Sequence, residues 1–132
     1  MNDIGASLEQ FIRSLETAKE VSGRIYRNNL PLDCKLPAIV YSLTNHVVSV
    51  SLEGHALHEV EFAISAYANQ PSLARKIGSR LCAVFRWYHG LMGAHWIRSC
   101  RLMGYSEEPD LESNADTQMG VATLNIAVMY GE

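Results

Sequence analysis

Apolar residues recur at helical spacing in two segments of the chain. The first segment repeats them at Ile4, Leu8, Phe11 and Leu15. Ser22-Gly23 is suited to end this segment, since glycine tolerates the conformation found at helix ends. The second segment begins at Pro71, which fits the first turn of a helix, and exits at Gly90 and Gly93. Its apolar arc contains Leu73, Ile77, Leu81, Val84, Phe85 and Tyr88. Both segments are predicted to be amphipathic helices.

Alternation of apolar and polar residues predicts strands between and after these helices. The clearest alternation covers residues 60–66, where Val60, Phe62 and Ile64 share one face. Further strand signals cover residues 24–27, 37–44, 96–105 and 121–130. The polar residues 45–54 fit either an extension of a hairpin or a flexible loop. The polar, acidic residues 106–120 are expected to form an exposed, mobile loop.

The order of these segments is helix, three strands, helix and two strands. Strands with one apolar face need a covering layer, which the helices can supply. The sequence therefore predicts an α+β fold, in which a mainly antiparallel β-sheet packs against two amphipathic helices. The chain has 132 residues, of which 48% are hydrophobic and 19% are charged, so we expect a single domain over residues 1–132.

Charge and composition bear on the partners that the chain can have. Its net charge of −3 is a poor match to nucleic acid, because such binding depends mainly on Lys and Arg neutralising phosphates. We therefore expect no specific nucleic-acid partner. No apolar run approaches the roughly 18 residues of a spanning helix, so no membrane partner is expected either. Three cysteines match no zinc spacing and are expected to be free thiols.

Residues able to do chemistry are present, but their spacing matches no catalytic or ligand-binding motif. His55 and His58 are close in sequence, whereas a zinc site needs three or four converging ligands. No serine lies in a G-x-S-x-G setting, and no glycine-rich phosphate loop is present. The sequence therefore predicts no catalytic residue, no metal site, no cofactor and no enzymatic activity.

The candidate functional residues are charged and aromatic side chains suited to contacts between subunits. On the second helix, the residues off the apolar arc include Arg75, Arg80 and Arg86, with Trp87 among them. Either Trp87 points outward, as at protein interfaces, or the helix ends before it and the ring turns into the core. The acidic candidates are Glu107, Glu108, Asp110 and Glu112. We expect the basic helix side of one subunit to meet the acidic loop of the next.

The order of several short motifs resembles a known family. Gly23-Arg24-Ile25-Tyr26 follows the first helix, and Leu36-Pro37-Ala38-Ile39-Val40-Tyr41 comes next. Tyr67-Ala68 precedes the second helix, and Tyr130 lies at the end of the last strand. In this order, over nearly the whole chain, the motifs resemble the tail-terminator, or tail-completion, proteins of long-tailed phages and prophages, including the minor tail protein U-like members.

The resemblance implies a structural role without an enzymatic site. It implies a hexameric ring that stops growth of the tail tube and provides the surface that joins the head. The partners would be further copies of the chain, the tail tube protein and the head–tail connector protein. The protein would lie in the virion tail, after assembly in the host cytoplasm. Three alternatives stay open: another neck component such as a head-completion or connector protein, a small regulatory or nucleic-acid-binding module, and an enzyme built from scattered residues.

Overall fold

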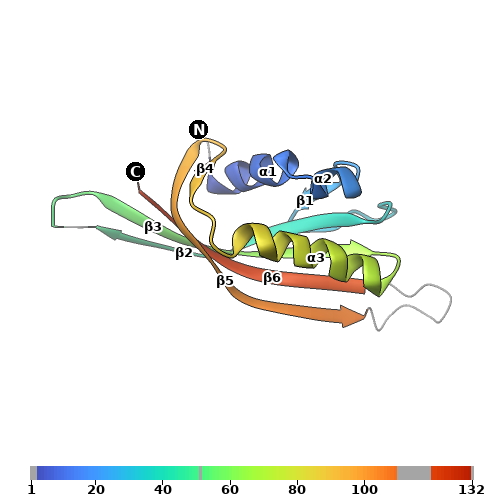
Figure 1. Cartoon of the computed structure of the whole chain (residues 1–132). Coiled ribbons are helices and arrows are strands. Elements are labelled where there is room, and N and C mark those ends of the chain that lie inside the picture. The colour runs from blue at the N-terminus through green and yellow to red at the C-terminus, as the bar shows by residue number, and fades with distance from the viewer. Residues whose placement is uncertain (1–2, 51, 110–119, 132) are drawn as a thin grey trace.

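The computed structural model describes residues 3–50, 52–109 and 120–131. Within them, a curled six-stranded sheet has the order β1-β2-β3-β6-β5-β4, and the helices cover one of its faces (Figure 1). The elements are α1 (Ile4–Ser14), α2 (Thr17–Glu20), β1 (Ile25–Arg27), β2 (Ala38–Val50), β3 (Ala56–Ala68), α3 (Pro71–Phe85), β4 (Gly90–Met92), β5 (His95–Pro109) and β6 (Gly120–Gly131). Neighbouring strands are antiparallel except β1 and β2, which are parallel. The predicted α+β class is confirmed.

The core lies between the helices and the covered face of the sheet. On β3, Val60, Phe62 and Ile64 are fully buried, as their alternation predicts. Leu8 and Ile12 of α1 reach the same core from the helical side. The fully buried residues that α3 and β6 add are Ile77, Leu81, Phe85, Leu124, Ile126 and Val128. Burial of apolar surface on this scale is the main favourable term in folding.

The first helix differs from its prediction, because it does not run to Ser22-Gly23. Asp3 caps its start by accepting a hydrogen bond from the Ala6 amide at 2.9 Å. The helix ends at Ser14, and a separate short helix, α2, follows. The Ser14 hydroxyl donates to the Phe11 carbonyl at 2.6 Å. Such local side-chain bonds compete with helical ones, and Leu15, the next residue, is extended.

The loop predicted over residues 106–120 is wrong at its start. Residues 106–109 continue β5, and Glu107 and Glu108 pair with Ala122 and Val121 of β6. Glu107 and Glu108 are exposed, so this part of the strand lacks the apolar alternation that marks a half-buried strand, while the backbone ladder still holds it. Residues 110–119 lie outside the described residues, so the expectation that this segment is mobile stays a prediction.

One further segment resolves a choice that the sequence left open, and another corrects a prediction. The polar residues after Thr44 extend the hairpin, because β2 continues to Val50 and pairs with β3 as far as Ala56. The prediction that Gly90 and Gly93 end the second helix is wrong: Gly90 is the first residue of β4, Gly93 follows that strand, and β4 pairs with the start of β5. Helix α3 itself ends at Phe85.

Candidate assembly interface

Arg75 and Glu107, which the sequence assigns to opposite halves of an interface, meet within one subunit. Arg75 Nε donates to Glu107 Oε2 at 3.0 Å, and Tyr105 Oη donates to Glu107 Oε1 at 2.7 Å. The hydrogen bond from Tyr105 and, to a smaller extent, that from Arg75 hold the pKa of the Glu107 carboxyl below its ordinary value of 4.5. Burial and the bond to Glu107 raise the pKa of Tyr105 to about 12. Glu108 lines the same small pocket as this pair.

Arg80 also has an internal partner. It forms an ion pair with Glu20, and this pair joins α3 to α2. Exposed pairs of this kind contribute little to stability, but an arginine already paired is less available to another subunit. Asp110 and Glu112, the remaining acidic candidates, lie outside the described residues.

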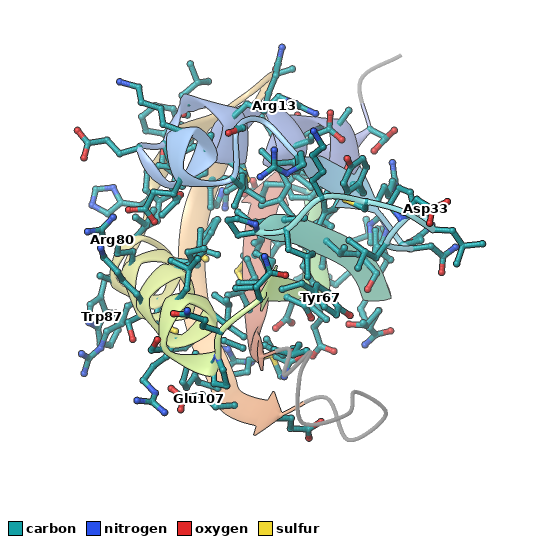
Figure 2. All side chains as sticks on the ribbon, turned by 90° about the vertical axis from the view of Figure 1, so that its right-hand side faces the viewer. Arg13, Asp33, Tyr67, Arg80, Trp87 and Glu107 are labelled. Carbon is teal, nitrogen blue, oxygen red and sulfur yellow. The ribbon has the colours of Figure 1, made fainter. Side chains whose placement is uncertain are left out.

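Arg86 and Trp87 differ from the other basic-side candidates, because they line an open groove. Helix α3 ends before Trp87, yet the ring does not turn into the core, since the residue is 77% exposed. Figure 2 shows Trp87 and Arg80 on the same side of the molecule. The groove, here called the Trp87 groove, has a volume of about 560 Å³. It lies between α3 and β5 and is lined by Ser79, Cys82, Ala83, Arg86, Trp87, Arg101, Leu102 and Tyr105.

The connected ends of β2 and β3 form a second distinctive surface. They project beyond the helices (Figure 1), and residues 44–50 and 52–58 are here called the hairpin arm. Val47, Val48 and Val50 are each at least half exposed, and Leu52 is fully exposed at the turn. Beyond Tyr41, no described strand pairs with the outer side of β2. The arm therefore presents apolar side chains that the subunit itself leaves uncovered.

A row of aromatic rings lies where the arm joins the core. His46 Nε2 and His58 Nδ1 are 2.8 Å apart, so they share one hydrogen bond. The His58 ring stacks on Tyr130, and His95 meets the same tyrosine edge-on. These contacts anchor the base of the arm to β6 and β5. No three described His, Cys, Asp or Glu side chains lie together as metal ligands would.

Ser7 and His95 are the described pair that most resembles a nucleophile and its base. Ser7 Oγ lies 2.6 Å from His95 Nδ1 and also accepts a hydrogen bond from the Ala94 amide. Ser7 is only 2% exposed, so a substrate would have little access to its hydroxyl. The geometry fits a different task, which is to hold α1 against the turn between β4 and β5.

No described helix is long and apolar enough to cross a membrane.

Comparison with solved structures relates this fold to others. The chain is similar to one from the virion of a native gene transfer agent particle, with a TM-score of 0.69 and 13% identity, over 97% of this chain and 93% of that one. A second solved structure aligns with a TM-score of 0.52 and 15% identity, over 95% of this chain and 92% of that one. No protein-family model matches the sequence, and no curated protein matches it significantly. At these identities, the likeness shows a shared fold.

Two parts of the candidate interface were missed by sequence reasoning. The floor of the Trp87 groove combines Cys82 of α3 with Leu102 and Tyr105 of β5, which only the fold brings together. The hairpin arm did leave a signal, because Val47, Val48 and Val50 interrupt an otherwise polar stretch. β-branched residues in such a stretch favour a strand over a flexible loop.

Proposed function

We propose that this chain is a structural protein of a phage-like virion and, more narrowly, its tail terminator. The observation that carries the broader part is the likeness in fold, over nearly the full length of both chains, to a protein from a gene transfer agent virion. The order of the G-R-I-Y and L-P-x-x-V-Y motifs supports the narrower part. Since fold alone does not fix function, the narrower part depends on the experiments below.

In this role the chain acts by binding and not by catalysis. Identical subunits close into a hexameric ring, one side of the ring stops growth of the tail tube, and the other side receives the head–tail connector protein. The ring forms in the host cytoplasm and ends in the virion tail. A closed ring larger than a dimer needs two different surfaces on each subunit. The Trp87 groove and the hairpin arm are two such surfaces.

Disruption of the gene in its source genome tests the role. The expected particles are tails of unregulated length together with heads that lack tails, and a plasmid copy of the gene should restore joined particles. Electron microscopy compares the tail lengths and the joining of heads to tails between the disrupted strain and the strain with the plasmid copy. Tails of normal length beside unjoined heads would indicate a different neck component, and normal joined particles would contradict the whole proposal.

The purified chain supplies a second, independent test. Light scattering and electron microscopy should detect a ring with six times the 14.7 kDa mass of the chain, on its own or upon addition of tail tubes. A chain that neither forms rings nor binds the ends of tubes is not a tail terminator.

A further inference from the structure

The chain segregates its charges along the sequence. No Lys or Arg occurs between Lys35 and Arg75, a stretch that contains the whole hairpin arm and the carboxylates of Glu53, Glu59 and Glu61. No Asp or Glu occurs between Glu61 and Glu107. That second stretch contains Arg75, Lys76, Arg80, Arg86, Arg98 and Arg101. The one carboxylate of the arm is Glu53, whereas the charged residues that line the Trp87 groove, Arg86 and Arg101, are both basic.

The two surfaces also match in their apolar parts. His46 pairs with the buried Val60 across the β2–β3 ladder. Side chains alternate along a strand, so Val48 and Val50 lie on that same face of the sheet. They extend the core face into the part that projects beyond the helices (Figure 1). The Trp87 groove offers aromatic and aliphatic walls of the kind that such side chains pack against.

Each surface also keeps one charge without a described partner. Glu53 at the tip of the arm and Arg86 on the rim of the groove form no ion pair with any described residue. By contrast, the pairs Arg75–Glu107 and Arg80–Glu20 are closed within the subunit. Arg101, the other arginine of the groove, is paired with Glu59. On these two surfaces, Glu53 and Arg86 are therefore left for an intersubunit contact, and they have opposite signs.

We propose that the hairpin arm of one copy of this chain docks into the Trp87 groove of the next copy. Val48, Val50 and Leu52 pack against Trp87, and Glu53 meets Arg86. The contact joins two different patches, so it does not pair with itself and propagates head to tail. This inference deepens the proposed function, since it names the surface that closes the ring, and its ring geometry rests on that proposal.

Two single variants, each with a matched control, test the contact. Trp87→Ala removes the wall of the groove, and its control is Trp96→Ala, which removes an exposed tryptophan outside the groove. Leu52→Asp places a charge on the apolar arm, and its control is Leu32→Asp, at another exposed leucine. The oligomer mass is measured by light scattering against concentration, and circular dichroism checks the fold. We expect association at least tenfold weaker for each test variant and unchanged for each control.

Mixing and charge exchange give signatures that a general loss of stability cannot produce. Trp87→Ala retains an intact arm and Leu52→Asp retains an intact groove, so the two should form heterodimers when mixed, but no larger assembly. Glu53→Arg and Arg86→Glu should each weaken assembly, and the double variant should recover much of it. Absence of both the heterodimer and the recovery overturns the proposed contact.

The outcomes separate this inference from the proposed function. If both test variants form rings like the wild-type chain, the contact is wrong and the tail-terminator role is untouched. If wild-type subunits associate into open filaments, and both test variants fail to form them, the contact is supported and the closed ring is not. A wild-type chain that stays monomeric up to about 1 mM, where even weak specific contacts register, and that also fails to assemble on tail tubes, overturns both.

Discussion

Replacing Gly78 by alanine tests how closely α3 must approach the sheet. Gly78 is buried on the inner side of α3. An added Cβ would lie 2.7 Å from Ala122 Cβ on β6 and 3.0 Å from Tyr105 Oη on β5. The Ala122 methyl is fixed to a central strand, so the helix or the sheet has to move.

Two opposing effects decide the magnitude. Alanine is a better helix former than glycine by about 1 kcal/mol, whereas overpacking a tight core costs about 1–3 kcal/mol. Because the short contact is to a rigid methyl group, the packing effect should win. The difference between the two effects is about 0–2 kcal/mol, and the rigid contact places Gly78→Ala in the upper part of that range, about 1–2 kcal/mol less stable than the wild type.

Urea unfolding followed by circular dichroism measures this change. With a slope of about 1–3 kcal/mol per molar urea, the midpoint should fall by about 0.3–2 M. The control is the double variant Gly78→Ala with Ala122→Gly, which removes the methyl that causes the clash. Measured against Ala122→Gly alone, the added methyl at position 78 should cost less than it does in the wild type, because the contact to Ala122 is gone and that to Tyr105 remains. A single variant as stable as the wild type, or an equal cost in the two backgrounds, would refute the reasoning.

Three further predictions concern the charged cluster, the helix anchor and nucleic acid. Because the pKa of Glu107 is lowered in the folded chain, its contacts stabilise the fold above pH 4.5, and this stabilisation is lost as the pH falls through the lowered pKa of the folded state. NMR titration should show the pKa of Glu107 rising more in Tyr105→Phe than in Arg75→Gln. Ser7→Ala should destabilise the chain by about 1–2 kcal/mol in urea, because His95 and an amide lose a buried partner, while Ser7→Thr should retain part of that stability. Binding to duplex DNA should be weak and independent of sequence at physiological salt, which a fluorescence titration over several salt concentrations checks; selective nanomolar binding would contradict it and favour a regulatory module.

Sequence reasoning succeeded where one side of an element is buried and the other is not. The alternation through Val60, Phe62 and Ile64 predicted β3 because burial of one face imposes a period of two on the sequence. The same reasoning failed at Glu107 and Glu108, whose strand is exposed and leaves no periodic trace. It also missed the end of α1 at Ser14, where a side-chain hydroxyl takes the Phe11 carbonyl and leaves no periodic trace in the sequence.

The candidate site was harder to predict than the fold, because a surface pocket depends on residues that are far apart in sequence. Trp87 was identified from its place among the arginines, but its exposure depends on the helix ending at Phe85. Leu102 and Tyr105 complete the groove only because β5 runs beside α3. No pattern within either segment reports that proximity.

The internal ion pairs also limit what charge can contribute to assembly. If Arg75 left Glu107 to bind a carboxylate on another subunit, one exposed pair would replace another, and each such pair contributes only about 0–1 kcal/mol. The net gain from such an exchange is small, and salt reduces it further. A stable ring must therefore draw most of its affinity from apolar surface that the isolated subunit leaves exposed, with charge setting which surfaces meet. By this argument, raising the salt concentration should slow the association of subunits more than it weakens the finished ring.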